Sequence, residues 1–390
     1  MTFDPAAQLP GAPEPWAGSV MPALRDGPPY LMTEMIAAEP ALGERLVRRL
    51  ASQSAMAELA ATIRAAADAG EPLLTTGCGT SEHAAMAVAA LLEDSLRVAG
   101  WPDPWVTSVQ AFELSRQPSS EGVVLGISHE GGTQATNEAL RVAREAGAMT
   151  ALISVSSRSP GAALADLVVT TDEQDQSWCH TVGYLSPLLA GTVLSAALRG
   201  DETDAVAVRA LLDTADDAPS AEAIAAGLQV CSRLLLVGSG IDYVTARELA
   251  LKVEEGARLP ATAHPLETIR HGHLAAADER TGLVMVLTDA EARGAELVDR
   301  ALAVLRSAAA LRMPAAAIIA ADLGDDVPLG LTPGGRAAVP LAGQLPRLPA
   351  LALASAIPAQ LVAERLARVR GVDPDTIGRD DPRQAAAADA

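Results

Sequence analysis

The stretch EPLLTTGCGTSEHAAMAVAALLEDSLRVAG, residues 71–100, contains the pattern on which the fold assignment depends. A short apolar run ends in a turn with two glycines, and a long Ala- and Leu-rich segment with helical periodicity follows. This order predicts a buried strand, a tight turn and a helix, the repeating unit of a parallel α/β sheet. Ligands of such sheets bind at the carboxyl ends of the strands, so binding residues are expected at the glycine turn.

Similar units continue along the chain. Residues 121–156 predict strand, Gly-rich turn, helix and strand, and ADLVVTTD at 165–172 adds another strand. The pattern then restarts, because RLLLVGSGIDYVTARELALKVEEGA at 233–257 again predicts strand, glycine turn and helix. The turn GCG of residues 77–79 recurs there as GSG at 238–240. We therefore expect one α/β domain used twice.

This organisation divides the chain into five predicted segments. The N-terminal segment is Pro-rich and extended before its helix, and the segment between the two predicted domains is acidic, which is typical of a linker. The segments are an N-terminal arm and helix at 1–44, a first α/β domain at 45–198, an acidic linker at 199–223, a second α/β domain at 224–370 and a C-terminal tail at 371–390.

The composition excludes several classes of partner. The 390 residues carry a formal net charge of −20, with 29 Lys+Arg against 49 Asp+Glu. Such a field repels nucleic acid and anionic membrane surfaces, so we expect neither as a partner. Hydrophobic residues make up 49% of the chain and charged residues 20%, as in a folded globular protein. An anionic ligand would need local N–H groups and helix dipoles to overcome the field.

Cysteine use and the N-terminus indicate a cytoplasmic protein. Cys78, Cys179 and Cys231 are widely spaced and form no C-x-x-C pair, so neither a disulfide framework nor a zinc site is predicted. Residues 1–20 lack the basic and apolar regions of a signal peptide. The longest apolar run, at 182–198, is interrupted by proline, and we expect no membrane span. No metal or other cofactor is indicated.

Two Gly-rich loops form the first candidate site. TTGCGTS at 75–81 and SHEGGT at 128–133 each follow a predicted strand and open a helix. Backbone N–H groups and hydroxyls at such turns can converge on an anion or a polyol. The alternative is that these residues only make tight turns and helix caps, but two such loops in one domain favour a ligand cradle. The candidate residues are Gly79, Thr80, Ser81, Ser128, His129, Glu130, Gly131 and Thr133.

The second candidate site centres on Lys252, the only lysine in the chain. In ELALKVEEGARLP (248–260), Lys252 and Glu255 are three residues apart and share a helix face. With His271 from the following loop, they could perform general acid–base chemistry on a carbonyl compound. One alternative is a surface pair between Lys252 and Glu248, although arginine would serve there equally well. Another is that the HGH sequence makes only a turn; no carboxylate at a diagnostic spacing supports a metal site there.

The ordered motifs resemble a known family. GCGTS, the S-x-x-G-x-T of SHEGGT, ALKVEE and IRHG are similar to the tandem SIS (sugar isomerase) domains in the isomerase half of glucosamine-6-phosphate synthase and in related phosphosugar isomerases, deaminases and deglycases. The resemblance runs from about residue 45 to 374. It implies an α/β fold of two flavodoxin-like SIS subdomains, each a parallel sheet flanked by helices. It also implies a homodimer with the active site near the subunit interface.

The resemblance further implies roles for individual residues. The family's phosphate-binding hydroxyls fall on Ser81, Ser128 and Thr133. The base that moves a proton between C1 and C2 of an open-chain sugar falls on Glu255. The histidine that helps to open the sugar ring falls on His271. Lys252 matches an active-site lysine, in a position to stabilise a developing oxyanion.

The sequence departs from the family at several points, one of which is His273 in place of the proline usual after HG. Position 2 is not a cysteine, so we expect no glutaminase domain and an amination would need a separate ammonia donor. The tail has no counterpart of the synthase's C-terminal lysine. Glu130 stands where the family pattern SQSGET has a serine, and a carboxylate at about 4 Å repels a phosphate by about 4 kcal/mol at an effective dielectric constant of about 20. We expect Glu130 to point away, to pair with His129, or to face a ligand that is not phosphorylated there.

These observations predict an enzyme that binds a small-molecule carbohydrate derivative, a sugar phosphate or amino-sugar phosphate. It would interconvert aldose and ketose through an enediol or enolamine, with amination, deamination or deglycation at C2 as coupled reactions. Two alternatives stay open: a non-catalytic SIS-type sensor, and an enzyme for a non-phosphorylated amino sugar. The presence of lysine, carboxylate and histidine favours an enzyme over a sensor.

Overall fold

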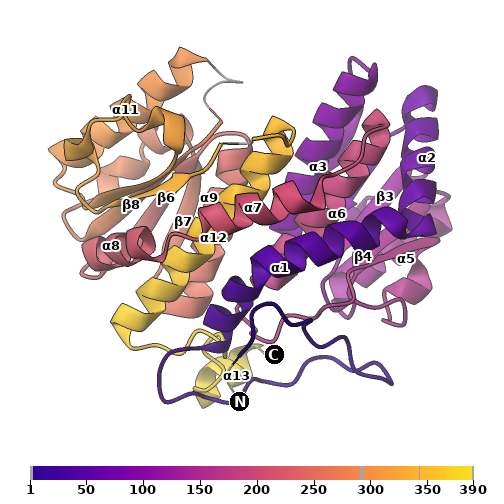
Figure 1. The fold of residues 1–390 in the computed structure, drawn as a ribbon, viewed down its shortest axis with the longest axis horizontal. Coiled ribbons are helices and arrows are strands. Elements are labelled where there is room, and N and C mark those ends of the chain that lie inside the picture. The colour runs from indigo at the N-terminus through magenta and orange to yellow at the C-terminus, as the bar shows by residue number, and fades with distance from the viewer. Residues whose placement is uncertain (1–2, 290–293, 342, 389–390) are drawn as a thin grey trace. The chain divides into compact units, whose positions relative to one another are not determined.

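The computed structural model describes residues 3–289, 294–341 and 343–388 (Figure 1). The chain folds into two compact units. The first unit contains residues 1–20, 38–175 and 182–209, and the second contains 21–37, 176–181 and 210–390. Each unit is built around one parallel β-sheet.

The first unit contains a five-stranded sheet in the order β2-β1-β3-β4-β5. All four neighbouring pairs are parallel. The central strands β1 and β3 are buried along their whole length, as expected for short apolar runs covered on both faces. The strands are β1 Leu73–Thr76, β2 Val106–Ser108, β3 Val123–Ile127, β4 Met149–Ser154 and β5 Leu167–Thr170.

The second unit repeats this topology. Its sheet has the order β10-β9-β8-β6-β7, again parallel throughout. Numbered within each unit, both sheets have the order 2-1-3-4-5, which is that of flavodoxin-like folds. The predicted α/β class with two flavodoxin-like subdomains is therefore confirmed. The strands are β6 Arg233–Gly238, β7 Ala261–Pro265, β8 Thr281–Leu287, β9 Ala315–Ala320 and β10 Arg336–Val339.

Helices flank both sheets. In the first unit α3 packs on α6, and in the second α12 packs on α9 and α8 (Figure 1). The first unit has α2 Ser54–Ala69, α3 Thr80–Ala99, α4 Ala111–Arg116, α5 Gln134–Ala146 and α6 Val182–Arg199. The second has α8 Ala218–Leu228, α9 Ile241–Ala257, α11 Ala295–Ala310, α12 Arg347–Arg370 and α13 Pro382–Ala388. Helices α1 Leu31–Ser52 and α7 Ala205–Ala215 contain residues of both units.

Several local features complete this description. Short 3-10 helices occupy Ala162–Leu164, Thr268–Arg270, His273–Ala276, Ala321–Leu323 and Leu329–Leu331. The predicted acidic linker is largely helical, since it contains α7 and the start of α8. Among the described residues, α6 and α12 are long and apolar enough to cross a membrane, but 89% and 100% of their apolar windows are buried inside the structure. That burial is typical of core helices.

The two glycine turns are nearly identical in geometry. A Cβ on Gly77 would lie 2.5 Å from the carbonyl oxygen of Ser81, and one on Gly238 would lie 2.4 Å from that of Asp242. Gly79 and Gly240, which precede α3 and α9, have φ/ψ of 58°/−128° and 60°/−125°. Such close approach and positive φ require glycine. The turns therefore hold the start of each helix directly against the end of its strand.

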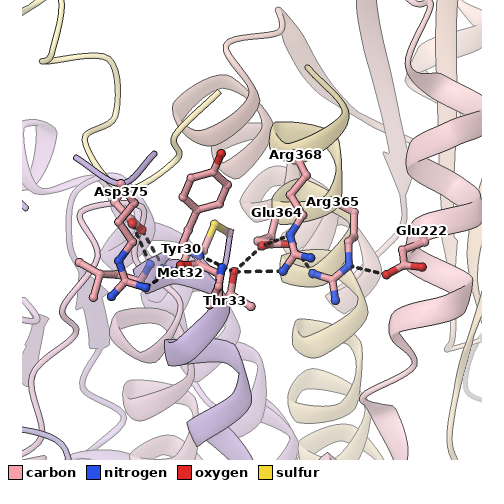
Figure 2. Close-up of polar contacts among 11 residues, drawn as sticks. Tyr30, Met32, Thr33, Glu222, Glu364, Arg365, Arg368 and Asp375 are labelled. Atoms are coloured by element: carbon pink, nitrogen blue, oxygen red, sulfur yellow. Dashed lines mark hydrogen bonds and ion pairs between the residues drawn. The ribbon is translucent and has the colours of Figure 1, made fainter. Parts of the chain in front are cut away.

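The start of α1 is held by the C-terminal tail within the second unit (Figure 2). The Asp375 carboxylate accepts hydrogen bonds from the backbone N–H groups of Leu31 at 2.7 Å and Met32 at 2.8 Å. A helix leaves these N–H groups unpaired, and a carboxylate there is stabilised by the helix dipole. The Thr33 hydroxyl donates a hydrogen bond to Glu364 of α12. The tail and α12 together thus fix the first turn of α1.

Glu364 is also the centre of a charge cluster (Figure 2). Its side chain is fully buried and pairs with Arg365 and, at 2.6 Å, with Arg368. Arg365 extends the cluster to Glu222 of α8 at 3.3 Å. A buried carboxylate needs such partners, because an unpaired buried charge is strongly destabilising.

The glycine turn predicts a specific sensitivity to substitution. Gly238→Ala should lower the free energy of unfolding by about 2–4 kcal/mol, because its Cβ would overlap the backbone of Asp242. Urea denaturation of the purified protein measures the change.

Gly330→Ala is the matched control, since nothing lies within 4 Å of a Cβ at that position. It should change stability by no more than about 0.5 kcal/mol. Equal effects of the two substitutions would contradict the role assigned to the turn.

Candidate active site

The two Gly-rich loops of the first unit meet at one edge of its sheet. The strands before them, β1 and β3, are paired directly, with Thr76 opposite Gly126. Residues 77–81 and 128–133 therefore lie side by side at the carboxyl ends of the strands, and we refer to them as the cradle. Helix α5 begins after Thr133 and helix α3 begins after Gly79. In neither helix does the N-cap side chain accept a hydrogen bond from the first turn. At α3 the N–H groups of Ser81 and Glu82 donate to the carbonyl oxygens of Cys78 and Gly79, so an anion there would be attracted mainly by the helix dipole.

The cradle residues differ in exposure. Ser128 is buried and its hydroxyl lies 3.5 Å from that of Thr133, which is exposed. Thr80 is buried, whereas Ser81 is partly exposed. Gly131 has φ +74°, and a Cβ there would overlap the Ser159 hydroxyl at 2.1 Å.

Glu130 does not pair with His129. The buried His129 ring accepts a hydrogen bond at Nε2 from the backbone N–H of Asp175 at 2.9 Å. The Glu130 carboxylate accepts hydrogen bonds from the backbone N–H of Ser19 at 3.2 Å and from the side chain of Gln174 at 3.4 Å. Its carbonyl oxygen accepts one from the Trp16 indole at 3.1 Å. The N-terminal arm, whose contact with the cradle we did not predict, thus holds Glu130.

At the carboxyl ends of the strands of the second sheet, the Asp242 carboxylate binds the backbone N–H groups. Asp242 follows β6 as Ser81 follows β1, and Thr288 follows β8 as Ser128 follows β3. The Asp242 side chain accepts hydrogen bonds from the N–H groups of Thr288 at 2.8 Å and Asp289 at 3.3 Å, and from the Thr288 hydroxyl. Groups that could bind an external anion here already have an internal partner. An anion or polyol cradle is therefore expected in the first unit.

Lys252 and Glu255 meet on α9 as predicted from their spacing. The Lys252 ammonium lies 2.5 Å from Glu255 Oε2 and 3.6 Å from Glu248 Oε1. Lys252 is only 1% exposed and Glu248 2%, whereas the Glu255 side chain is 24% exposed. The lysine is therefore a core residue, and Glu255 is the member of the cluster that a ligand can reach.

The buried lysine is a permanent cation. Burial alone lowers the pKa of Lys252, but the carboxylates of Glu255 and Glu248 outweigh this effect and hold the pKa above its usual value. An ammonium that keeps its proton cannot serve as a base. It can orient the neighbouring carboxylate and favour its ionised form.

Cys179 joins this cluster and was not predicted as a site residue. Its thiol is fully buried and lies 3.9 Å from both Glu255 Oε2 and the Lys252 carbonyl oxygen. A Cβ on Gly256 would lie 3.3 Å from the same sulfur. Cys179 precedes α6 and lies far from α9 in sequence, so no local pattern could have indicated the contact.

His271 lies outside the Lys252 cluster. It is exposed and its Nε2 lies 3.0 Å from Glu267 Oε1. Glu267 also pairs with Arg300 and lines a cavity of about 370 Å³ that Ser239, Leu266, Glu296 and Leu297 complete. His273, the second histidine of HGH, stacks on His264 with ring centroids 4.0 Å apart. Within the described residues no group of three or more His, Cys, Asp or Glu side chains is placed to hold a metal ion.

Comparison with known proteins identifies the family. The SIS domain family matches residues 68–198 and 227–311, together more than half of the chain. The chain belongs to the SIS domain family. The two matched segments contain the cradle and α9, so both candidate sites of this SIS protein lie within the residues that the family model matches.

Individual relatives of the SIS protein are distant. It is 26% identical over 329 residues to the glutamine–fructose-6-phosphate aminotransferase (isomerizing) of Streptomyces coelicolor, covering 78% of this chain and 50% of that protein. The chain thus spans half the length of this relative.

Solved structures share the fold. The C-terminal domain of glucosamine-fructose-6-phosphate aminotransferase from Francisella tularensis superposes with a TM-score of 0.75 at 21% identity, covering 91% of this chain and all of that one. Tagatose-6-phosphate ketose/aldose isomerase from Escherichia coli superposes with a TM-score of 0.65 at 18% identity, covering 92% and 97%.

The charge cluster on α9 predicts a large stability effect. Lys252→Met would leave the Glu248 and Glu255 carboxylates without the ammonium and should lower the free energy of unfolding by about 3–5 kcal/mol. Adding Glu248→Gln should recover part of the loss, because one of the two uncompensated charges is then removed. Urea denaturation of the single and double variants tests this, and a neutral single variant would contradict it.

The buried Asp242 carboxylate predicts that the free energy of unfolding depends on pH. Burial raises the pKa of Asp242 from 3.8 to about 6, even though hydrogen bonds from Thr288 oppose the shift. The folded state therefore binds this proton more tightly than the unfolded state. The resulting stabilisation is complete only well below the unfolded pKa of 3.8 and is lost as the pH rises through 6.

Asp242→Asn removes this titration. The stability of the wild type relative to the variant should fall by about 2 kcal/mol between pH 4 and pH 7. Denaturant unfolding of both proteins at each pH measures the difference. Parallel pH curves would show that Asp242 titrates normally.

Proposed function

We propose that this SIS protein is a sugar isomerase in which Glu255 is the base. The observation that carries the proposal is the contact between the partly exposed Glu255 carboxylate and the buried Lys252 ammonium at 2.5 Å. Family membership supports sugar binding and isomerase-type chemistry. The names of two relatives, an isomerizing aminotransferase and a ketose/aldose isomerase, support the same class of reaction.

The proposed reaction is a proton transfer between adjacent carbons of an open-chain sugar. Glu255 takes the proton from the carbon beside the carbonyl, which leaves an enediol, or an enolamine if the substrate is an amino sugar. It then returns the proton to the neighbouring carbon, so that aldose and ketose interconvert. Because Lys252 is buried, it acts through Glu255: it fixes the position of the carboxylate and favours the ionised form that a base requires.

Other parts of the proposal come from the sequence. The cradle hydroxyls of Ser81, Ser128 and Thr133 bind the sugar, and His271 assists ring opening. Amination, deamination or deglycation at C2, a separate ammonia donor, a homodimer and a cytoplasmic location stay predictions. The catalytic role of Glu255 can be tested without any of them.

Hydrogen exchange provides the test. In D₂O the wild type should replace the hydrogen at C2 of an aldose substrate, or at C1 of a ketose, by deuterium, and ¹H NMR follows the loss of signal. Fructose 6-phosphate, glucosamine 6-phosphate and the corresponding free sugars are the probes. Glu255→Gln should slow the exchange by about 10²–10⁴-fold, because the amide cannot accept the proton.

Glu254→Gln is the matched control. Glu254 is the exposed neighbour of the proposed base, and its Oε1 accepts a hydrogen bond from the Ala261 N–H, which glutamine can also accept. This variant should exchange hydrogen at the wild-type rate. Undiminished exchange in Glu255→Gln would exclude Glu255 as the base, and no exchange in the wild type with any probe would favour a non-catalytic sensor.

A further inference from the structure

The N-terminal arm closes one side of the cradle. The Trp16 indole N–H donates to the Glu130 carbonyl oxygen at 3.1 Å, and its ring would lie 3.0 Å from a Cβ on Gly132. The Ser19 N–H donates to the Glu130 carboxylate at 3.2 Å. The same arm is fixed elsewhere on the first unit, since the Leu9 N–H donates to the buried Glu173 carboxylate at 2.9 Å. The arm is therefore part of the cradle wall.

The charge balance of the cradle does not favour a phosphate. The N-termini of α3 and α5 each contribute roughly half a positive charge. Glu130 contributes a full negative charge, and its partners among the described residues, Trp16, Ser19 and Gln174, are all uncharged. His129 is neutral in this arrangement, because its Nε2 accepts a hydrogen bond from Asp175. The charges of the two helix N-termini and of Glu130 thus approximately cancel, which does not favour the binding of a phosphate dianion.

The polar and aromatic groups around the cradle are of the kinds that bind an amino sugar. The Glu130 carboxylate has about four acceptor positions, of which the arm and Gln174 use two. The others can accept hydrogen bonds from a hydroxyl or an ammonium group. The half-buried Trp16 ring lies with the edge of its six-membered ring beside Gly132, and an indole can attract both an ammonium and the C–H face of a sugar ring. The hydroxyls of Ser128 and Thr133 add partners for a polyol.

We propose that Glu130 and the arm segment 16–19 make the cradle specific for an amino sugar that carries no phosphate at this position. The inference rests on the proposed function for the assignment of the cradle as a sugar site. It gives Glu130 two roles, since the residue holds the arm in place and excludes phosphate. Trp16 is a specificity residue supplied by a segment outside both sheets.

Calorimetry of ligand binding tests the inference separately from catalysis. All titrations use Glu255→Gln protein, in which turnover is removed, with glucosamine and glucosamine 6-phosphate as probes at one ionic strength. The parent should bind glucosamine about tenfold or more tightly than its phosphate. Glu130→Gln keeps an oxygen that can accept from Ser19 and should shift this ratio about tenfold towards the phosphate. Trp16→Leu should weaken glucosamine binding.

Glu14→Gln is the control for a general charge effect. Glu14 lies on the same arm and forms an exposed ion pair with Arg158 at 2.6 Å. Its loss should leave the ratio of the two affinities unchanged. Tighter binding of the phosphate by the parent, equal shifts in the Glu130 and Glu14 variants, or no binding of either probe would overturn the inference.

The two proposals fail in different ways. Hydrogen exchange by the wild type together with a preference for phosphate would overturn the specificity and leave the isomerase in place. A preference for glucosamine without hydrogen exchange would do the reverse.

Discussion

The close approach of helix and strand at Gly77 and Gly238 is the constraint on which both units depend. In each turn the backbone of the following helix lies where a side chain would otherwise begin. The helix N-terminus is thereby held at the carboxyl end of the sheet, beside the neighbouring central strand. Each unit consequently presents a cluster of backbone N–H groups at the same place in the fold, before any side chain is considered.

The two units differ in the side chains that lie beside these N–H groups. In the second unit the Asp242 carboxylate accepts hydrogen bonds from the N–H groups at the end of β8. In the first unit the corresponding position is Ser81, and hydroxyls together with the arm-bound Glu130 surround the site. The same turn is therefore filled differently in the two units, and the second unit carries the charge cluster of α9. Burial of the Lys252 ammonium requires carboxylates around it and leaves one of them, Glu255, partly exposed.

The contacts around both candidate sites, and the cap of α1, join segments that are far apart in the sequence. Cys179 reaches Glu255, Trp16 and Ser19 reach Glu130, and Asp375 caps α1. Each contact involves at least one segment of irregular backbone. Such segments carry no periodicity, and their positions follow from the folded packing of the whole unit.

The sequence by itself determined the α/β class, the duplication and the pairing of Lys252 with Glu255. The periodicity of apolar residues, the glycine turns and the three-residue spacing of Lys252 and Glu255 are local properties, so backbone geometry alone determines their structural result. The tertiary structure decided that Lys252 is fully buried, that Glu130 is held by the arm and that His271 lies exposed beside Glu267. Burial and long-range hydrogen bonds arise only when distant segments pack together. For that reason the fold and the contact between Lys252 and Glu255 were predictable, whereas the charge environment of the candidate site residues was not.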